Sequence, residues 1–553
     1  MSFESCVGDV LEKFGELGAR PFLREREFAV VEIDISTILR RFEHPVRFFV
    51  ATNAFIEESL RSDFHWLDNR YIEFSNSELF PILVTPPGTK AKSKRLIRKS
   101  VFGREQPVVS IEKLLKKGDI SELIRRELLE DIGYDLVSPY RVDTTTPGGM
   151  FFGRGKPLNR LRHLRGNLMV YGPRRIGKSS LVVQLQKELG FIPKVVSSNK
   201  PSLKPLKKCA YVDVSALGET ASTEIWGQII KSFGLDAHSL YKYYGRKVRL
   251  TGGKTDEKDA YLDEVKSLEV FISSLEGQLT IILDEVDGWI EREALSGWTA
   301  IDRLRALTDR GKANVILVGY ESLQAAAENH RFPLVNRGDH LPLGPLNRDA
   351  VKELILSPLA ELRIKLLPEN EIIERIWQAS SGFPHLVQDI CKHLVEKCLG
   401  ASDKKHVVDN NITKAAIDDS EAIANYRRGV INSDFPLAEA IAGLTCVRSS
   451  SSQAKPTSRD TFSNDEIAGL LEQAGYQFDG KEYELALSYL SLRAILRPID
   501  STRTSWTWVN TFARQDMERR ITKLGFNRWR DSVMRQHEEG SWKEKYRVLG
   551  RLN

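Results

Sequence analysis

The sequence has few cysteines and none of the patterns in which cysteines bind zinc or form redox pairs. Five cysteines occur among 553 residues, and no two are spaced as C-x-x-C, so neither a disulfide framework nor a zinc site is expected. Cys391 and Cys398 are seven residues apart in a segment with a helical pattern. This spacing fits two buried helical positions better than a redox pair.

Long apolar runs are also missing. No stretch of about 18 consecutive apolar residues occurs, so no membrane span is expected. Residues 1–6 have neither a basic segment nor an apolar core, and they do not resemble a signal peptide. We therefore expect a cytoplasmic protein.

An excess of charge of one sign is absent as well. A net charge of +6 over 553 residues neither requires nor excludes nucleic acid, so local basic clusters must decide. With 41% hydrophobic and 28% charged residues, the chain has enough apolar side chains for several cores. Its length predicts three or four domains.

One motif is distinctive in this ordinary composition. Residues 172–179 read Gly-Pro-Arg-Arg-Ile-Gly-Lys-Ser, the phosphate-loop pattern G-x-x-x-x-G-K-[ST]. An apolar run at 167–171 predicts a buried strand before it, and 179–185 predicts the start of a helix after it. Backbone N–H groups and the helix N-terminus would then face one anion. The candidate nucleotide contacts are Gly172, Pro173, Arg174, Arg175, Ile176, Gly177, Lys178, Ser179 and Ser180.

The chemistry of nucleotide hydrolysis needs a cation, a metal ligand and a base. Lys178 is expected to reach the β- and γ-phosphates, and the Ser179 hydroxyl to bind Mg²⁺. Residues 279–287 form an apolar strand that ends in Asp-Glu-Val-Asp. Asp284 is expected to hold Mg²⁺, directly or through water, and Glu285 to deprotonate the attacking water. The alternative is a strand followed by an acidic surface loop.

These motifs together resemble the STAND/AAA+ group of P-loop ATPases, and above all the archaeal-type ATPases and their bacterial relatives. The resemblance extends over residues 150–420 or so. Besides the phosphate loop and Leu181, it rests on the segments 152–154, 281–287, 315–319, 332–337, 341–346 and 382–385.

The resemblance implies roles for residues outside the two motifs. In that family the F-G-R segment, here Phe152, Gly153 and Arg154, lies beside the adenine. The G-x-P segment of the helical lid, which here includes Pro384 and His385, contacts the bound nucleotide, although His385 has lid packing as an alternative role. Gly155 and Lys156 stand where an acidic residue commonly follows F-G-R, so the contacts on the adenine side stay open.

Two further elements are candidates for the γ-phosphate side. Residues 313–322 predict a buried strand with polar residues at its carboxyl end, where ligands bind in open α/β sheets. Tyr320 or Ser322 would sense the phosphate there, and simple termination of the strand is the alternative. Arg337 is the candidate arginine finger; its alternative is a surface arginine before a turn at 338–339.

The sequence pattern predicts an α/β protein with a P-loop NTPase sheet domain. A polar, turn-rich linker at 143–149 precedes it, and helical patterns at 348–362, 369–380, 384–399 and from 412 follow it. The Ser-rich stretch 448–458 is expected to be a flexible loop or linker. The predicted parts are an N-terminal α/β domain (1–142), the ATPase domain (150–340), a helical lid (341–425), a winged-helix domain (426–515) and a charged helical tail (516–553).

The winged-helix prediction rests on a short pattern. Ser463 and Glu466 have capping-box spacing, a second helix is expected at 482–492, and strands at 495–498 and 506–509 would form the wing. Winged helices often bind DNA through the second helix. Here that helix carries Glu482 and Glu484, which favour a protein contact or a structural role over phosphate contacts.

The N-terminal part is expected to be the recognition or output domain. Strands are predicted at 46–51, 80–84 and 107–111, and helices near 53–62 and 119–130. The basic cluster at 90–99 is interpreted as a solvated face in preference to a nucleic-acid site, because no aromatic residues interleave. The segment 79–115 faintly resembles restriction-endonuclease-like folds, but Glu32 and Asp34 are not followed by the lysine that a nuclease needs.

The C-terminal tail leaves two alternatives open. It is basic and contains Trp529 and Trp542, so it would either track nucleic acid or pack its tryptophans on the body of the protein.

Two functional hypotheses follow. The first is a slow, Mg²⁺-dependent ATPase that acts as a molecular switch, with a role in signalling or prokaryotic defence implied by the resemblance alone. The second is a DNA-binding ATPase of the origin-recognition or helicase-loader type. Both predict ATP and Mg²⁺ as cofactors. Expected partners are a protein bound by the N-terminal or winged-helix domain, nucleic acid at the basic clusters, or further copies of the chain assembled by nucleotide.

Overall fold

The computed structural model describes residues 3–24, 28–34, 46–51, 81–85, 108–110, 138–140, 148–192, 206–233, 268, 272, 279–309, 311, 313–335, 338–399, 406–429, 435–451, 461–499 and 502–543. Two compact units emerge: residues 1–152, 348–377 and 386–420 form the first, and residues 153–347, 378–385 and 421–553 form the second. Among the described residues, no helix is both long and apolar enough to cross a bilayer.

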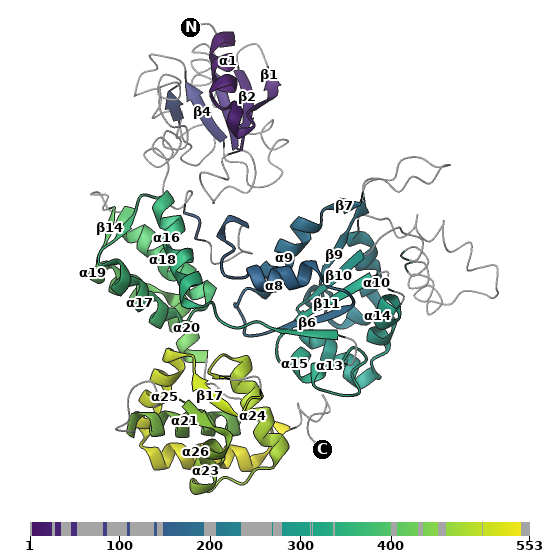
Figure 1. Ribbon diagram of the computed structural model, residues 1–553, viewed down its shortest axis with the longest axis vertical. Helices are drawn as coiled ribbons and strands as arrows, with labels where there is room; N and C mark the ends of the chain where they lie inside the picture. The colour runs from purple at the N-terminus through teal and green to yellow at the C-terminus, as the bar shows by residue number, and fades with distance from the viewer. Residues whose placement is uncertain are drawn as a thin grey trace, which may run out of the picture. The chain divides into compact units, whose positions relative to one another are not determined.

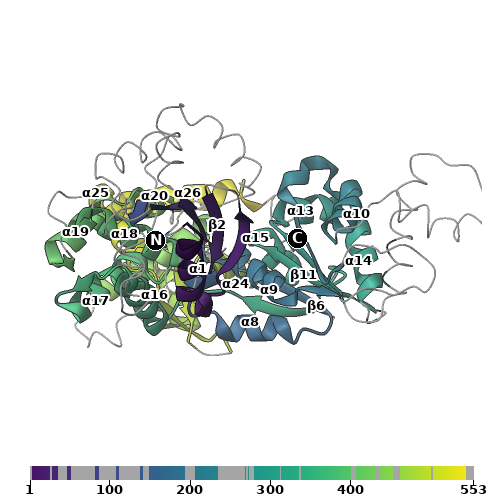
Figure 2. The same cartoon turned by 90° about the horizontal axis from the view of Figure 1, so that it is seen from above.

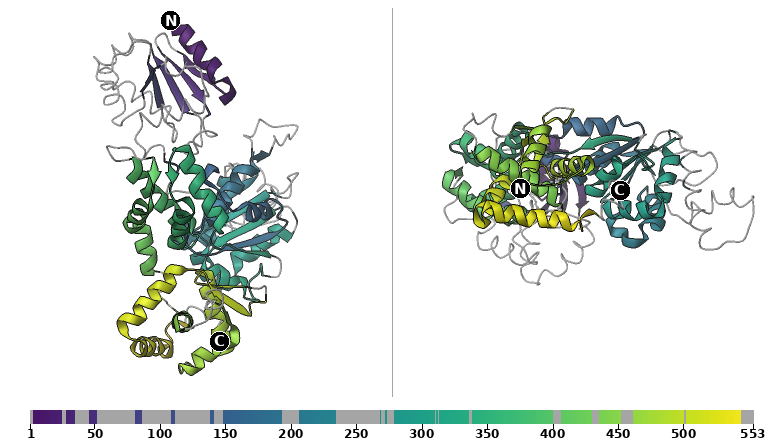
Figure 3. Two further views of the ribbon diagram at one scale, coloured as in Figure 1. Left: turned by 60° about the vertical axis from the view of Figure 1, so that its left-hand side comes forward. Right: turned by 90° about the horizontal axis from the view of Figure 1, so that it is seen from below.

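The first unit begins with a five-stranded mixed sheet in the order β1-β2-β3-β4-β5. Strands β1 to β3 are antiparallel, whereas β4 and β5 run parallel to β3. Helix α1 packs on β2 and β3, as Figures 2 and 3 show. The bounds are α1 Phe3–Lys13, β1 Arg20–Arg24, β2 Phe28–Ile33, β3 Val46–Ala51, β4 Pro81–Thr85 and β5 Val108–Ser110.

The three strands predicted in this part are confirmed. The predicted helices near 53–62 and 119–130, the basic cluster at 90–99 and most of the linker at 143–149 lie outside the described residues.

Four helices predicted after residue 347 are confirmed, and most of their residues belong to the first unit. They are α16 Arg348–Glu361, α17 Glu369–Ser380, α18 Pro384–Leu399 and α19 Asn410–Asp419. The two cysteines of α18, Cys391 and Cys398, are fully buried. Their helical spacing thus indicated packing correctly.

The second unit contains a five-stranded sheet, in the order β12-β6-β11-β10-β9, in which every neighbouring pair is parallel. Strands β6, β10 and β11 are buried throughout. Parallel sheets are covered on both faces and read as continuous apolar runs, which is why these strands were evident in the sequence. The bounds are β6 Asn167–Tyr171, β9 Cys209–Asp213, β10 Leu279–Asp284, β11 Ala313–Gly319 and β12 Gly338–Pro342.

Helices surround this sheet (Figure 1). Helix α10 packs on β9, α14 on β11, and α15 on β6 and β11. The bounds are α8 Gly155–Arg162, α9 Lys178–Leu189, α10 Ala221–Ser232, α13 Asp287–Ser296, α14 Thr299–Asp309 and α15 Glu321–Ala327. With the phosphate-loop sequence between β6 and α9, the predicted P-loop NTPase fold is confirmed.

Residues 435–543 form a separate hydrophobic core within the second unit. Helix α23 begins at a capping box, in which Glu466 N donates to Ser463 Oγ (3.1 Å) and Ser463 N donates to Glu466 Oε2 (3.0 Å). The three strands are antiparallel in the order β15-β17-β16. The elements are α21 Pro436–Ser451, β15 Thr461–Ser463, α23 Asn464–Gln473, α24 Gly480–Leu492, β16 Leu496–Pro498, β17 Ser505–Trp508, α25 Thr511–Leu524 and α26 Phe526–Glu539.

These elements match the predicted helices and hairpin, while their identity as a winged helix stays a prediction. The two tryptophans of the tail are buried in this core, Trp529 at 1% and Trp542 at 7% exposure. Of the two alternatives for the tryptophans, packing on the body is therefore confirmed.

Two local predictions are wrong. The Ser-rich stretch at 448–458 is helical as far as Ser451, because α21 continues and buries Ser449. The expected turn at 338–339 is the first part of strand β12, which pairs with β6. Strand β8 (Leu206–Lys207) pairs with β7 (Phe191–Ile192) in a further two-stranded sheet.

Candidate functional site

The phosphate loop connects the carboxyl end of β6 to the N-terminus of α9. Its first glycine is required by a close approach: a Cβ at Gly172 would lie 2.2 Å from the carbonyl oxygen of Leu343. Leu343 is fixed there because its N–H donates to the Tyr171 carbonyl (2.7 Å). The segment that follows β12 therefore holds the beginning of the loop in place.

Lys178 is buried, with 7% exposure. Its Nζ donates to the carbonyl oxygens of Gly172 (2.9 Å) and Pro173 (3.0 Å). Burial lowers the lysine pKa, and the nearby carboxylates of Glu285, Asp287 and Asp284 oppose this effect. The lysine would exchange its bonds to the loop carbonyls for bonds to a phosphate.

Asp284 ends strand β10 and is 1% exposed. Its Oδ1 accepts from Glu285 N (2.9 Å), and its Oδ2 accepts from the Tyr211 hydroxyl (2.8 Å). Within the described ranges, no three His, Cys, Asp or Glu side chains form a group that could hold a metal ion.

Glu285 follows Asp284 and is exposed. Its φ of 53° lies in the left-handed region, which costs an L-residue about 1–2 kcal/mol. Partial desolvation raises the pKa of Glu285, Lys178 opposes this, and Asp284 adds to it. Strained backbone at a carboxylate with a perturbed pKa is typical of functional sites.

Asp287 is a residue that the sequence reasoning did not assign to the site. Its carboxylate accepts from the N–H groups of Tyr320 (2.6 Å) and Ser322 (2.8 Å) at the start of α15. Burial raises its pKa and these hydrogen bonds lower it. Asp287 thus joins the acidic turn after β10 to the end of β11. The only signal in the sequence was the third acid of Asp-Glu-Val-Asp.

The two candidate phosphate sensors have different surroundings. Ser322 is buried at 1% exposure, and its hydroxyl donates to Glu291 Oε1 (2.5 Å). The Tyr320 ring centroid lies 5.8 Å from Lys178 Nζ, and burial raises the pKa of Tyr320 to about 12. Of the two, Tyr320 is the residue beside the loop lysine.

Arg154 of the F-G-R segment braces the phosphate loop. Its Nη2 donates to the carbonyl oxygens of Ile176 (2.9 Å) and Gly344 (2.7 Å). The side chain is buried at 8% exposure, and burial lowers its pKa to about 10. Phe152 is half-buried and Gly153 is exposed.

Arg175 and His385 contact each other, with 2.7 Å between Arg175 Nη1 and His385 Nε2. A guanidinium has only donors, so His385 Nε2 is the acceptor in this contact. Pro384 begins helix α18. The G-x-P segment therefore contacts the phosphate loop through His385.

The comparisons with known proteins agree with this geometry. A family model described as an AAA domain matches residues 161–326, which contain the phosphate loop, Asp284 and Glu285. This part of the chain is therefore similar to AAA domains. No curated protein matches the chain.

Solved structures similar to the chain include the Walker-type ATPase PABY2304 of Pyrococcus abyssi, with 16% identity, a TM-score of 0.41, and 68% of this chain and 99% of that one covered. The Aeropyrum pernix ORC2 protein in ADPNP–ADP complexes has 15% identity and a TM-score of 0.37, with 66% and 92% covered. The Aeropyrum pernix ORC1 protein in complex with DNA has 15% identity and a TM-score of 0.32, with 68% and 96% covered.

Arg337, the candidate arginine finger, lies outside the described residues.

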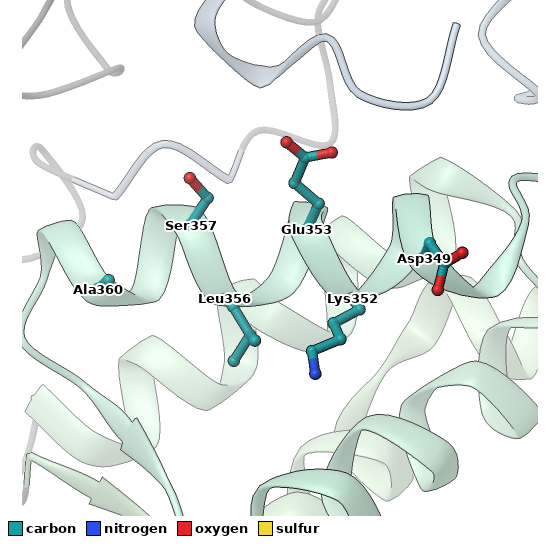
Figure 4. Close-up of a pocket in the computed structure, with 6 residues that line it drawn as sticks. All are labelled: Asp349, Lys352, Glu353, Leu356, Ser357 and Ala360. Carbon is teal, nitrogen blue, oxygen red and sulfur yellow. The ribbon is translucent and has the colours of Figure 1, made fainter.

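A pocket away from the phosphate loop is lined only by residues of helix α16 (Figure 4). It brings together no phosphate-binding loop and no strand ends, so it is not a candidate nucleotide site.

Proposed function

We propose that this protein binds ATP with Mg²⁺ and hydrolyses the nucleotide slowly, as a molecular switch. One observation carries the proposal: Lys178 Nζ lies 5.8 Å from the centroid of the Tyr320 ring, and the Tyr320 N–H donates to Asp287 (2.6 Å), so the phosphate loop and the acidic turn after β10 form one cluster. This cluster lies at the carboxyl ends of β6 and β10, the edge at which open parallel sheets bind ligands.

The roles of the residues follow from their chemistry. The loop backbone from Gly172 to Ser180 cradles the phosphates, and Lys178 neutralises their charge. Ser179 and Asp284 would hold Mg²⁺, which neutralises charge that develops on the β- and γ-phosphate oxygens. Glu285 accepts the proton of the attacking water.

Other assigned residues are part of the proposal. Phe152, Gly153 and Arg154 form the adenine side, and Arg154 supports it indirectly by bracing the loop at Ile176. Pro384 and His385 contribute from the G-x-P segment, with His385 acting through Arg175. Arg337 is retained as the candidate finger.

The switch part of the proposal rests on connections between the site and other elements. His385 connects the phosphate loop to the start of α18, and Asp287 connects the acidic turn to α15. On α15, Gln324 Nε2 donates to Ser488 Oγ of α24 (2.8 Å). A change at the γ-phosphate would therefore be transmitted to the start of α18 through His385 and to α24 through Gln324. A signalling or defence role and nucleotide-dependent assembly extend this proposal through the family resemblance.

The DNA-binding alternative requires surfaces that can reach a duplex. Helix α24, which would read DNA in a winged helix, has most of its residues buried, including Glu482 and Ser488. Its exposed charged residues are Lys481 and Glu484, which have opposite signs. Binding of duplex DNA that weakens with salt and needs basic residues would support this alternative instead.

Glu285→Gln tests the proposal. The amide cannot accept the proton, so we expect hydrolysis to fall by about 10²- to 10⁴-fold while ATP affinity is kept. Single-turnover hydrolysis and equilibrium binding of labelled ATP measure the two effects separately. The matched control is Glu224→Gln, an exposed glutamate on α10, which should leave both unchanged. Unchanged hydrolysis in Glu285→Gln would contradict the assignment of the base.

A further inference from the structure

Tyr211 brings a phenol hydroxyl to the predicted metal ligand from the neighbouring strand. Strands β9 and β10 are parallel, and Tyr211 is in register with Ile282, two residues before Asp284. Because side chains alternate along a strand, Tyr211 and Asp284 lie on the same face of the sheet. The Tyr211 hydroxyl donates to Asp284 Oδ2 over 2.8 Å.

The position of Tyr211 is itself fixed by the fold. Its N–H donates to Ser232 Oγ (2.8 Å), and Ser232 Oγ donates back to the Tyr211 carbonyl (2.9 Å). A tyrosine hydroxyl has one proton to donate, and in this position it donates to the carboxylate of Asp284.

The two oxygens of Asp284 have donors from different elements. Glu285 N holds Oδ1 from the following turn, and Tyr211 holds Oδ2 from β9. Two donors fix the plane of the carboxylate, and each oxygen keeps a lone pair for a cation. The next carboxylate on this face, Asp213, is in register with Asp284 and accepts from Ser215 N and Oγ.

We propose that Tyr211 is a positioning residue that orients Asp284 toward a divalent cation bound with ATP. The proposal rests on the function inferred above, in which Asp284 is a ligand of Mg²⁺. Partners that orient metal ligands typically contribute 10- to 100-fold to metal affinity. Nothing in the motif sequence marks Tyr211, because it lies about seventy residues from Asp284 and on another strand.

The test is Tyr211→Phe, which removes the hydroxyl and keeps the ring. Mn²⁺ replaces Mg²⁺ as the probe, and its binding is followed by electron paramagnetic resonance with a non-hydrolysable ATP analogue bound. We expect the Mn²⁺ affinity to fall by about 10- to 100-fold. Analogue affinity in EDTA and the thermal midpoint should match those of the wild type, which a merely structural role would not predict.

Two controls separate the outcomes. Tyr483→Phe removes a hydroxyl that donates to the Asn464 carbonyl over a similar 2.8 Å, and it should leave Mn²⁺ affinity unchanged. Asp284→Asn shows how far Mn²⁺ affinity falls when the metal ligand itself is removed. If Asp284→Asn weakens Mn²⁺ binding and Tyr211→Phe does not, the positioning role is overturned and the proposed function stands. If Asp284→Asn leaves Mn²⁺ affinity unchanged, Asp284 is not a metal ligand, and both that assignment and the positioning role of Tyr211 are wrong.

Discussion

The carboxyl edge of the parallel sheet and the C-terminal helices at 435–543 both contain many polar residues, but they use them differently. At the sheet edge, Arg174, Arg175 and Glu285 are exposed beside a loop shaped for an anion. In the C-terminal helices, Glu482 and Ser488 are buried among other side chains. The sheet edge thus keeps charged residues exposed around the buried Lys178 and Asp284, whereas Glu482 and Ser488 of the C-terminal helices are enclosed by packing.

The difference has a topological origin. Parallel strands end at one edge and place their last side chains together, as β6, β10 and β11 do with the phosphate loop, Asp284 and Tyr320. The C-terminal helices instead enclose a core of their own. Trp529 lies against α21 so closely that a Cβ at Gly443 would be 2.0 Å from its ring.

The largest expected effect that would test this comparison comes from Trp529→Ala. Removing a fully buried tryptophan should lower the free energy of unfolding of the C-terminal core by about 3–5 kcal/mol, measured by urea denaturation. The adjacent exposed Arg528→Ala on α26 is the control and should change little. A stable Trp529→Ala variant that loses affinity for nucleic acid would contradict this contrast between the two regions, because the tryptophan would then act as a ligand-binding residue.

An intermediate effect is expected in the pH dependence of hydrolysis. Desolvation raises the pKa of Glu285, and a general base works only when it is ionised. The rate should therefore decline as the pH falls through this raised pKa, by about tenfold per pH unit below it. The acidic limb should lie at higher pH than for an ordinary glutamate, and the residual rate of Glu285→Gln should lack it. A limb at the ordinary glutamate pKa would show that the sheet edge does not tune this carboxylate.

The smallest expected effect is that of Ser488→Ala. Its hydroxyl accepts from Gln324 Nε2 (2.8 Å) and donates to Glu328 Oε1 (3.2 Å), so its loss should lower the free energy of unfolding by about 1 kcal/mol. Ser532→Ala, at an exposed position on α26, is the control. If Ser488→Ala alters ATP hydrolysis but not unfolding, α24 is part of the switch and the contrast with the sheet edge becomes less sharp.

The strands that position the site could be predicted from the sequence because their signals are local. The apolar run 167–171 is the observed extent of β6, and the capping box at Ser463 forms as its spacing indicated. The winged-helix identity and the site roles stay predictions. Tyr211 and Asp287 could not be found in this way, since each acts on a partner that is distant along the chain or through backbone N–H groups.

Arg154 and His385 show that sequence-based prediction is limited in the same way for residues inside the motifs. The family resemblance placed both near the nucleotide, whereas their observed partners are loop carbonyls and the Arg175 side chain. A motif fixes which residue types are present, but the direction of a long side chain depends on the carbonyls and charges that surround it in the folded chain.

The sequence by itself determined the phosphate loop, the apolar strands and the acidic strand end, because each is a contiguous pattern set by backbone geometry and burial. Only the tertiary structure decided that Tyr211 and Glu285 N hold the two oxygens of Asp284, that Asp287 joins the acidic turn to α15, and that the tryptophans of the tail are core residues. These depend on strand register and helix packing, which bring together residues that no local pattern connects.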